Sequence, residues 1–546
     1  MVTISGEGLT IGDIAAVARG ARVELTRDPA VLARVGASRD RIAEAVAQGR
    51  QIYGVTTLYG GMADTAVPRD RLEELQRLAL WHHKSATGPR LASADIRAAM
   101  LLRANSLLKG VSGVRLELIE RFVTFLNAGA TPHVFARGSI GASGDLTPLS
   151  YIGGALVGLD PAFLVDLDGE TLDGHAALRR LGLEPLALQP KEGLALNNGT
   201  AASTGVAANC VERAFELTAL VFGAHALCFQ ALLATTQSFA PLVHEAKPHP
   251  GQRWAAAEMR ALLDGSSLLR EQALERWTPG GGVLIQDRYS LRCLPQYAGP
   301  IVDGLAGLAR QVEVEANSAS DNPLVDPDTG EIFHTGNFLA EYTAVAMDRL
   351  RYHLAMLASH LDAQLALLVA PEFSGGLAPS LVGNTEAGIN VGLKSVQVAC
   401  NALAPLVGFY GHAMADRYPT HAEQFNQNIN SQAMNAANLA RESLDVLAHL
   451  VAAALVMSVQ AVELRAASIA ASYDASDALS PATRALYAAV RRAAGGAPDP
   501  ARPMVWNDLD GFLEPKVEGV LAGVAGGGIV AESMAPVRES LRSHRT

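Results

Sequence analysis

The sequence predicts an all-α protein with an N-terminal lobe and a central bundle of long helices. Residues 337–370 and 420–480 contain neither glycine nor proline, in a chain of 546 residues that carries 51 glycines and 26 prolines. Such gaps indicate long, uninterrupted helices. Leu444, Leu447, Val451 and Leu455 recur at three- and four-residue steps, as on a helix that faces a core. The alternation typical of strands is scarce.

The composition divides the chain into three segments. Residues 1–200 have short periodic stretches and glycine-rich joints, so they form the N-terminal lobe. Residues 201–480 are the central helical bundle, which begins with a helix over about 204–239. Residues 481–546 form a shorter C-terminal helical portion. The glycine-rich loop at 279–282 is expected to be mobile.

Composition also narrows the class of protein. With 49% hydrophobic residues the chain can bury a large core, and its net charge of −11 without a basic block argues against nucleic-acid binding. The four cysteines are scattered, which fits neither a zinc site nor a disulfide framework, and no metal is expected. Polar residues interrupt the most apolar stretches, so we expect core helices, no membrane span and a cytoplasmic protein.

The most unusual stretch is residues 137–148, Arg-Gly-Ser-Ile-Gly-Ala-Ser-Gly-Asp-Leu-Thr-Pro. Three interpretations compete for it. An ordinary turn could lead into a helix with Ser143, Asp145 or Thr147 as the N-cap and Pro148 at the first helical position. A phosphate-binding loop is disfavoured, because neither GxGxxG nor GxxxxGK[ST] is present.

The third interpretation is cyclisation of the backbone. The amide nitrogen of Gly144 reaches the carbonyl carbon of Ala142 only in a compressed turn, and a glycine offers no Cβ to obstruct it. Loss of water would close a five-membered ring. Loss of the Ser143 hydroxyl would then leave a methylidene group conjugated to the ring, which is an electrophile. Spacing alone favours the ordinary cap.

The rest of the chain reverses that preference, because from about Ile52 to the C-terminus it resembles the aromatic amino acid ammonia-lyase and aminomutase family. That family includes histidine, phenylalanine and tyrosine ammonia-lyases. The stretch 137–148 is similar to its prosthetic-group loop, and other motifs follow in the family's order. They are Tyr53-Gly54-Val55-Thr56-Thr57, Asn198-Gly199-Thr200, residues 286–293 (QDRYSLRC), Asp321-Asn322-Pro323, Gly336-Asn337-Phe338 and residues 421–428 (HAEQFNQN). The last motif and Pro371-Glu372-Phe373 look more like bacterial phenylalanine ammonia-lyases than histidine ammonia-lyases.

The resemblance implies non-oxidative deamination of an aromatic L-amino acid to the trans-arylacrylate and ammonia. It implies a 4-methylidene-imidazol-5-one made from Ala142, Ser143 and Gly144, with no metal and no dissociable cofactor. It also implies a homotetramer whose active sites are shared between subunits, so that Tyr53 and Ser143 need not come from the same chain.

Individual roles follow from the same resemblance. Tyr53 would be the base that removes the β-proton, which requires surroundings that lower its pKa. Arg292 would bind the substrate carboxylate with its two-pronged guanidinium group. Gln427 would lie one helical turn after Glu423. The remaining expected catalytic residues are Asn198, Gln286, Tyr289, Phe338 and Glu423, and the expected substrate-binding residues are Leu58, His82, His83, Lys394, Asn426 and Gln427.

Two departures from the family pattern bear on the substrate and on loop closure. Leu58 replaces a glycine that usually follows the Tyr-Gly-Val-Thr-Thr motif, which puts the mobility of that loop in question. His82 and His83 occupy the pair that faces the substrate ring, where the family typically has Phe-Leu, His-Leu or Ser-His. An imidazole can bond a ring oxygen, so tyrosine or another ring-oxygenated phenylalanine is expected first and phenylalanine next.

Other readings of the sequence remain. An aromatic amino acid 2,3-aminomutase would use the same prosthetic group and return ammonia to the β-carbon. A histidine ammonia-lyase fits the 423–428 motif less well. A helical scaffold that has lost catalysis is the alternative from another class, although every core motif is present.

Overall fold

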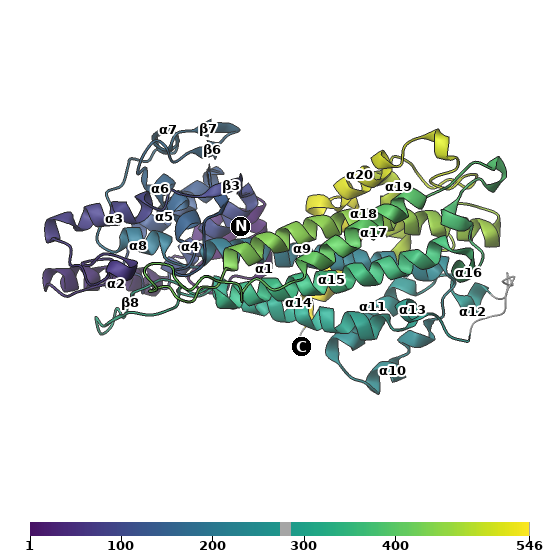
Figure 1. The fold of residues 1–546 in the computed structure, drawn as a ribbon, viewed down its shortest axis with the longest axis horizontal. Helices are drawn as coiled ribbons and strands as arrows, with labels where there is room; N and C mark the ends of the chain where they lie inside the picture. Colours follow the sequence, from purple (N-terminus) through teal and green to yellow (C-terminus); the bar gives the residue numbers. More distant parts are fainter. Residues whose placement is uncertain (274–284, 545–546) are drawn as a thin grey trace. The chain divides into compact units, whose positions relative to one another are not determined.

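The computed structural model of the protein describes residues 1–273 and 285–544, and the loop at 279–282 lies outside them. The described chain is mainly helical, with short strands in small sheets (Figure 1). The chain forms two compact units. The first comprises residues 1–212, 308–349 and 413–441, and the second comprises residues 213–307, 350–412 and 442–546.

The long helices expected from the sequence are present, with corrected ends. Helix α15 (Glu341–Val369) fills the first gap in glycine and proline, and α18 (Ala433–Ala470) fills most of the second. The helix expected over 204–239 is α9 (Ala201–Ala231), which ends early because Leu233 adopts a left-handed backbone with φ of 51°. By length and composition α9 and α18 could cross a membrane, but 94% and 83% of their apolar windows are buried in the protein.

The division into units differs from three consecutive segments. Most boundaries between the units lie inside long helices rather than in loops, so each of these helices has residues in both units. The segments 1–200, 201–480 and 481–546 stay a prediction about domain organisation. The four helices concerned are α9, α15, α18 and α14 (Leu294–Ala316).

The first unit is built around α4 (Ser93–Leu107), which is buried on nearly every side. Helix α4 packs on α1 (Ile11–Ala18) and α5 (Leu116–Ala128), and α3 (Leu72–Trp81) packs on α8 (Glu192–Asn197). The other helices are α2 (Pro29–Ala47), α6 (Leu146–Val157) and α7 (Gly174–Arg180).

The strands of the first unit form small separate sheets. Strands β1 (Val2–Ile4) and β2 (Val23–Leu25) are parallel, with Val2 opposite Val23. The remaining pairs are antiparallel: β3 (Thr87–Arg90) with β5 (Phe135–Arg137), β6 (Val165–Leu167) with β4 (Thr131–Pro132) and β7 (Glu170–Leu172), and β8 (Leu324–Val325) with β9 (Ile332–Phe333). The expected all-α class therefore needs a small correction, because the mainly helical chain also contains these short strands.

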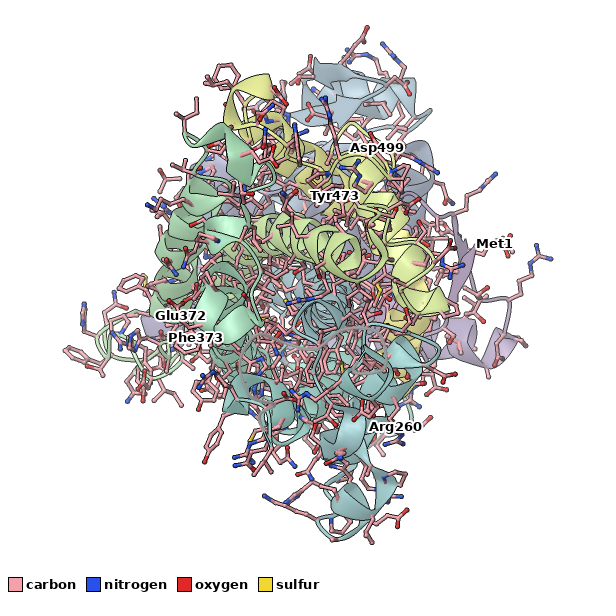
Figure 2. The ribbon with its side chains drawn as sticks, turned by 90° about the vertical axis from the view of Figure 1, so that its right-hand side faces the viewer. Met1, Arg260, Glu372, Phe373, Tyr473 and Asp499 are labelled. Atoms are coloured by element: carbon pink, nitrogen blue, oxygen red, sulfur yellow. The ribbon has the colours of Figure 1, made fainter. Side chains whose placement is uncertain are left out.

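The described residues of the second unit form helices and connecting loops, without a strand. The buried guanidinium of Arg465 on α18 donates to the carbonyl oxygens of Ala231 and Ser374, which ties the ends of two helices to a third. Glu372 and Phe373 are exposed at its surface (Figure 2). The Arg288 guanidinium covers the Phe373 ring at 4.3 Å. Its other helices are α10 (Pro241–Glu245), α11 (Pro250–Leu263), α12 (Arg270–Ala273), α13 (Tyr289–Arg292), α16 (Pro371–Ser374), α17 (Lys394–Tyr410), α19 (Pro481–Ala493), α20 (Glu514–Val524), α21 (Ile529–Glu532) and α22 (Ala535–Ser543).

Candidate active site

The loop that leads into α6 is pressed against the turn that follows α8. Gly144 adopts a left-handed backbone with φ of 72° and pairs with Gly199. A Cβ on Gly144 would stand 2.2 Å from the Gly199 carbonyl oxygen, so no other residue fits. The next amide, that of Asp145, donates to the same oxygen at 2.7 Å. The loop is therefore packed closely against Gly199 at the position where cyclisation was expected.

Ser143 is held at both of its oxygens. Asn198 Nδ2 donates to the Ser143 carbonyl oxygen at 2.8 Å, and Gln427 Nε2 donates to the Ser143 hydroxyl at 2.9 Å. Ser431 Oγ donates to the Gly141 carbonyl oxygen at 3.2 Å, which fixes the loop two residues before Ser143. The Asn198 Oδ1 atom is buried without a hydrogen bond in the described structure. These contacts fit a group made from residues 142–144.

The ordinary capped turn is not what the structure contains. Asp145 occupies the N-cap position of α6, but its side chain does not cap the helix. The carboxylate instead accepts from the backbone nitrogen of Ser203 at 2.7 Å and from its hydroxyl at 2.9 Å. Burial raises the pKa of Asp145 to about 6, and the bonds from Ser203 oppose that rise. Asp145 therefore joins the loop to the first turn of α9.

A cavity of about 430 Å³ opens over Ser143. A second, of about 410 Å³, shares Tyr53, Ser143, Asn198 and Gln427 with it. The first is lined further by Leu58, Tyr59, Gly60, Met62, Leu78, Ala79, His82, His83, Leu146, Leu194, Asn197 and Glu423. The second is lined further by Ala142, Asn322, His334, Thr335, Gly336, Phe338, Leu339, Asn426, Asn428 and Ile429. Tyr53 and Ser143 thus line one cavity within a single chain, which the resemblance left open.

Tyr53 lies in this cavity, but its surroundings in the chain do not lower its pKa. The phenolic oxygen accepts a hydrogen bond from the Gly60 amide at 3.0 Å. Burial raises the pKa of Tyr53, the Gly60 amide lowers it, and the negative charge of Glu423 raises it again. The lowered pKa expected for a base is absent here, because desolvation outweighs the single amide bond.

The segment that carries Tyr53 packs closely on the 421–428 motif. A Cβ on Gly60 would stand 2.4 Å from Glu423 Oε2, and one on Gly61 would stand 2.1 Å from Gln424 Oε1. Leu58 lies between these contacts and Tyr53, lines the first cavity, and donates from its amide to the Thr65 carbonyl oxygen. Glycine is favoured at position 60 by its left-handed backbone with φ of 57°, and at position 61 because a Cβ would stand 2.8 Å from the Glu423 carbonyl oxygen.

The motif around Glu423 is not helical, contrary to the sequence analysis. Glu423, Gln424 and Phe425 have φ values of 50°, 53° and 65°, and a bridge between Ala422 and Gln427 closes the turn. Left-handed backbone is costly for residues with a Cβ, so surrounding contacts must hold it. Glu423 and Gln427 nevertheless line the same cavity, because the tight turn brings them to one side.

His82 and His83 line the first cavity at the end of α3. Their ring centroids are 3.9 Å apart, and His82 stacks on Tyr59 at 6.3 Å. Nδ1 of His83 is 2.8 Å from the Ala79 carbonyl oxygen, and Nδ1 of His82 contacts the Leu78 carbonyl oxygen. A carbonyl beside Nδ1 assigns the proton to that nitrogen and leaves Nε2 for another partner. Burial, followed by the charge of His82, lowers the pKa of His83 to about 4, so His83 is neutral.

The remaining predicted residues divide between the two units. Phe338 and Asn426 line the second cavity of the first unit. Four others belong to the second unit, and three of them lie in or beside α13, where the Arg292 guanidinium covers the Tyr289 ring at 4.4 Å. None of the described residues that line either cavity is a lysine or an arginine. The four predicted site residues that belong to the second unit are Gln286, Tyr289, Arg292 and Lys394.

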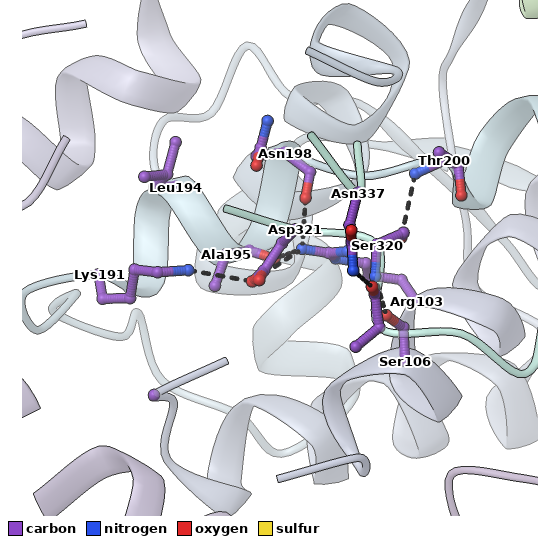
Figure 3. Close-up of polar contacts among 12 residues, drawn as sticks. Arg103, Ser106, Lys191, Leu194, Ala195, Asn198, Thr200, Ser320, Asp321 and Asn337 are labelled. Carbon is purple, nitrogen blue, oxygen red and sulfur yellow. Dashed lines mark hydrogen bonds and ion pairs between the residues drawn. The ribbon is translucent and has the colours of Figure 1, made fainter. Parts of the chain in front are cut away.

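Sequence reasoning missed a buried charge cluster beneath Asn198 (Figure 3). Lys191 Nζ lies 3.0 Å from Asp321 Oδ2, and Arg103 Nη2 lies 3.7 Å from the same atom. All three side chains are fully buried. Asp321 opens the Asp-Asn-Pro motif, so that motif could have drawn attention to it. Lys191 and Arg103 stand in no motif and were not detectable by pattern.

The fold and the site together define a mainly helical protein whose glycine-rich serine loop and a tyrosine line one cavity. The sequence model of the aromatic amino acid lyase family matches residues 9–492. The chain belongs to that family. It is 59% identical over 545 residues to an aromatic ammonia-lyase of Loktanella atrilutea, with 100% of both chains covered. It is 53% identical to a phenylalanine ammonia-lyase of Nostoc punctiforme, covering 100% of this chain and 96% of that one.

Solved structures agree with the family assignment. The crystal structure of a tyrosine aminomutase from Streptomyces globisporus superposes with a TM-score of 0.87 at 31% identity, covering 98% of both chains. The helical architecture predicted from the sequence is therefore that of the family.

Proposed function

We propose that the protein removes ammonia from an aromatic L-amino acid that carries a ring oxygen, and releases the trans-arylacrylate. Its membership of the aromatic amino acid lyase family supports carbon–nitrogen lyase chemistry. The single observation that carries the proposal is the placement of Ser143. Its two oxygens accept from Asn198 and Gln427, in a cavity that also holds Tyr53 and the histidine pair.

The electrophile is made from the chain itself. The Gly144 nitrogen forms a bond to the Ala142 carbonyl carbon, and the Ala142 oxygen leaves as water with the hydrogens of the Gly144 and Ser143 nitrogens. The Ser143 hydroxyl then leaves as a second water with the Ser143 Cα hydrogen, which forms the exocyclic double bond. The contacts of Gly144 with Gly199 favour this closure, because they hold the turn compact before any bond forms.

The finished group supplies an electrophile that binds the substrate amine and makes it a leaving group. Asn198 would hold the ring through the former Ser143 carbonyl oxygen, which it already contacts. Phe338 would pack beside the ring, and Glu423 and Asn426 would face the substrate's polar end from the walls of the two cavities.

Tyr53 would remove the β-proton from the substrate. Because burial raises its pKa in the single chain, a positive charge from outside the two cavities must lower it in the working site. The substrate carboxylate has the same need for a cation, since neither cavity is lined by lysine or arginine among the described residues.

A homotetramer with shared sites meets both needs. The second unit carries Arg292, Lys394, Tyr289 and Gln286, and a second unit from another subunit could complete the cavities of the first. Arg292 would bind the carboxylate with two hydrogen bonds, and its charge would stabilise the ionised form of Tyr53. Size measurement in solution tests this assembly, since a monomer with full activity would contradict it.

His82 and His83 would recognise the ring. Both are held by their Nδ1 atoms, so their Nε2 atoms remain for the substrate. An apolar wall cannot reward a ring oxygen, whereas an imidazole can form a hydrogen bond with it. Tyrosine and other ring-oxygenated phenylalanines are therefore the preferred class, and phenylalanine is next.

An aminomutase is the second candidate function, because the tyrosine aminomutase of Streptomyces globisporus has the same architecture. The two reactions differ in whether ammonia leaves or returns to the β-carbon. A histidine ammonia-lyase is less well supported, since the 40% identity to that of Anaeromyxobacter dehalogenans covers 85% of this chain.

Product analysis across tyrosine, phenylalanine, histidine and oxygenated phenylalanines tests the proposal. We expect an arylacrylate and an equal amount of ammonia, with the highest kcat/KM for a ring-oxygenated substrate. A β-amino acid as the main product would instead establish the mutase. Urocanate formed from histidine as the best substrate would establish the histidine enzyme.

A further inference from the structure

The fully buried guanidinium of Arg103 touches the back of the turn against which the serine loop is pressed. Arg103 lies on α4, at the centre of the first unit. Its Nη2 donates to the Asn198 carbonyl oxygen at 2.9 Å and also to the Ala195 carbonyl oxygen (Figure 3). These are carbonyls at the end of α8, which lack partners within the helix. Arg103 therefore ties the end of α8 to α4.

Arg103 also leaves no space behind Gly199. A Cβ built on Gly199 would stand 2.3 Å from Arg103 Nη1 and 2.9 Å from Ser320 Oγ. On the opposite side, a Cβ on Gly144 would stand 2.2 Å from the Gly199 carbonyl oxygen. Gly199 is thus enclosed between the guanidinium and Gly144. A backbone enclosed in this way cannot retreat when the loop closes.

A buried cation requires compensation, and Asp321 supplies it. Burial lowers the pKa of both Arg103 and Lys191, and the charge of Asp321 opposes that change for each. Lys191 contacts Asp321 Oδ2 at 3.0 Å and is the first residue before α8. Two cations therefore share one carboxylate, and it is Arg103 that donates to the carbonyl oxygens of residues 195 and 198.

We propose that Arg103 is a positioning residue for the self-cyclisation of residues 142–144. It holds the 198–199 turn rigidly against Gly144, so that the Gly144 nitrogen is kept near the Ala142 carbonyl carbon. Arg103 itself exchanges no proton and forms no bond in the two dehydrations. This inference rests on the proposed function, because it concerns formation of the group that the function requires.

The experiment follows ring formation directly rather than activity. Chains are produced by cell-free synthesis, the folded fraction is isolated by size exclusion, and intact mass is recorded over time together with near-ultraviolet absorbance. The variants Arg103→Met and Lys191→Met form a matched pair. Each removes one buried cation from Asp321, but only the first removes the carbonyl contacts. Arg103→Lys keeps the charge and loses the fork.

A further control is Arg97→Lys. Arg97 lies on the same helix, is buried, and donates to the carbonyl oxygens of Val17 and Leu126, away from the loop. We expect Arg103→Met and Arg103→Lys to lose two waters at least about tenfold more slowly than the wild type, the change that follows when one or two hydrogen bonds are missing at the barrier. Lys191→Met and Arg97→Lys should cyclise within about twofold of the wild type.

Three results would overturn the proposal. The first is a wild-type rate of water loss in folded Arg103→Met or Arg103→Lys. The second is an equal slowing in Lys191→Met, which would show that buried charge matters and the carbonyl contacts do not. The third is failure of both Arg103 variants to fold while Arg97→Lys folds, which would make Arg103 a residue of the fold alone. A wild-type chain that never loses two waters would contradict the proposed function instead.

Discussion

Asn198 and Ser143, which are 55 residues apart in the chain, are joined by a hydrogen bond of 2.8 Å from the Asn198 Nδ2 atom to the Ser143 carbonyl oxygen. This bond fixes Ser143, the middle residue of the serine loop, to the turn after α8, whose Gly199 pairs with Gly144. In the proposed cyclisation this oxygen would become the ring carbonyl, and Asn198 would already donate to it. One contact would therefore serve both the proposed formation of the group and its later polarisation.

The first prediction concerns the mass of the protein. The purified wild-type chain should be lighter than its sequence by two waters and should absorb in the near ultraviolet. The physical reason is the absence of space between Gly144 and Gly199, which holds the turn compact. Intact-mass spectrometry checks this, with Gly144→Ala as a control that should keep its full mass. An unmodified wild-type chain with full activity would refute the prosthetic group.

The second prediction concerns Asn198. Replacing it with alanine removes the bond to the Ser143 carbonyl oxygen, so ring formation should slow and the remaining cyclised enzyme should lose kcat by about tenfold or more. Gln427→Ala removes the bond to the Ser143 hydroxyl, the group that would leave during the proposed dehydration. Asn198→Ala should therefore have the larger effect on kcat per cyclised chain, measured by absorbance-normalised turnover. Equal effects would mean that the carbonyl bond has no special part.

The third prediction separates two neighbouring tyrosines. Tyr53→Phe should fold, cyclise and lose about 10²–10⁴-fold in kcat, because it lacks the atom expected to take the β-proton. Tyr59 is the matched control, since its hydroxyl already donates to the Leu75 carbonyl oxygen at 2.9 Å and its ring packs on Tyr53 at 6.4 Å. Tyr59→Phe should keep most of its turnover. Near wild-type kcat in Tyr53→Phe would require another base.

The fourth prediction tests recognition of the ring. His82→Phe should shift the ratio of kcat/KM from tyrosine toward phenylalanine by roughly 1–3 kcal/mol, the cost of losing one buried hydrogen bond. His83→Phe should change this ratio less and should matter more for rings with a second oxygen. The decisive measurement is the tyrosine-to-phenylalanine ratio in the wild type and both variants. An unchanged ratio in His82→Phe would leave ring recognition to other residues.

The fifth prediction concerns stability and pH in the second unit. His225 and His360 are buried side by side, with Nε2 of His225 3.3 Å from Nδ1 of His360, and Gln364 Oε1 lies 2.6 Å from His225 Nδ1. The ring of Tyr297 stacks on His360 at 4.8 Å. Burial lowers the pKa of His360 to about 4 and that of His225 well below its usual value, so both are neutral.

The sign of the effect follows from proton binding. Between pH 6.5 and about 4 the unfolded chain binds more protons at these histidines than the folded one, so their contribution to the free energy of unfolding falls as pH falls. His360 alone accounts for a loss of up to about 3 kcal/mol at the acid end. Glu463, whose pKa burial raises to about 7, acts with the opposite sign. Urea unfolding at several pH values should therefore show a smaller acid loss in His225→Gln/His360→Gln than in the wild type; identical slopes would contradict the assignment.

The sequence by itself determined the helical class, because the long stretches without glycine or proline became α15 and most of α18. It also singled out residues 142–144, since the order of small residues and the distant motifs are properties of the chain. It could not predict the three left-handed residues at 423–425, because that backbone is costly locally and this segment packs against Gly60 and Gly61, which are far away in sequence. A helical turn was the local expectation, and it was wrong.

Only the tertiary structure brought Arg103, Lys191 and Asp321 together beneath Asn198. No local pattern marks a buried arginine, whose place depends on carbonyls that α8 leaves without partners. The pKa of Tyr53 was likewise decided by burial and by Glu423, which a sequence cannot weigh against one amide bond. Residue types and their order determine which chemistry the chain can perform, whereas desolvation and close packing exist only after folding and determine where each charge and each backbone atom lies.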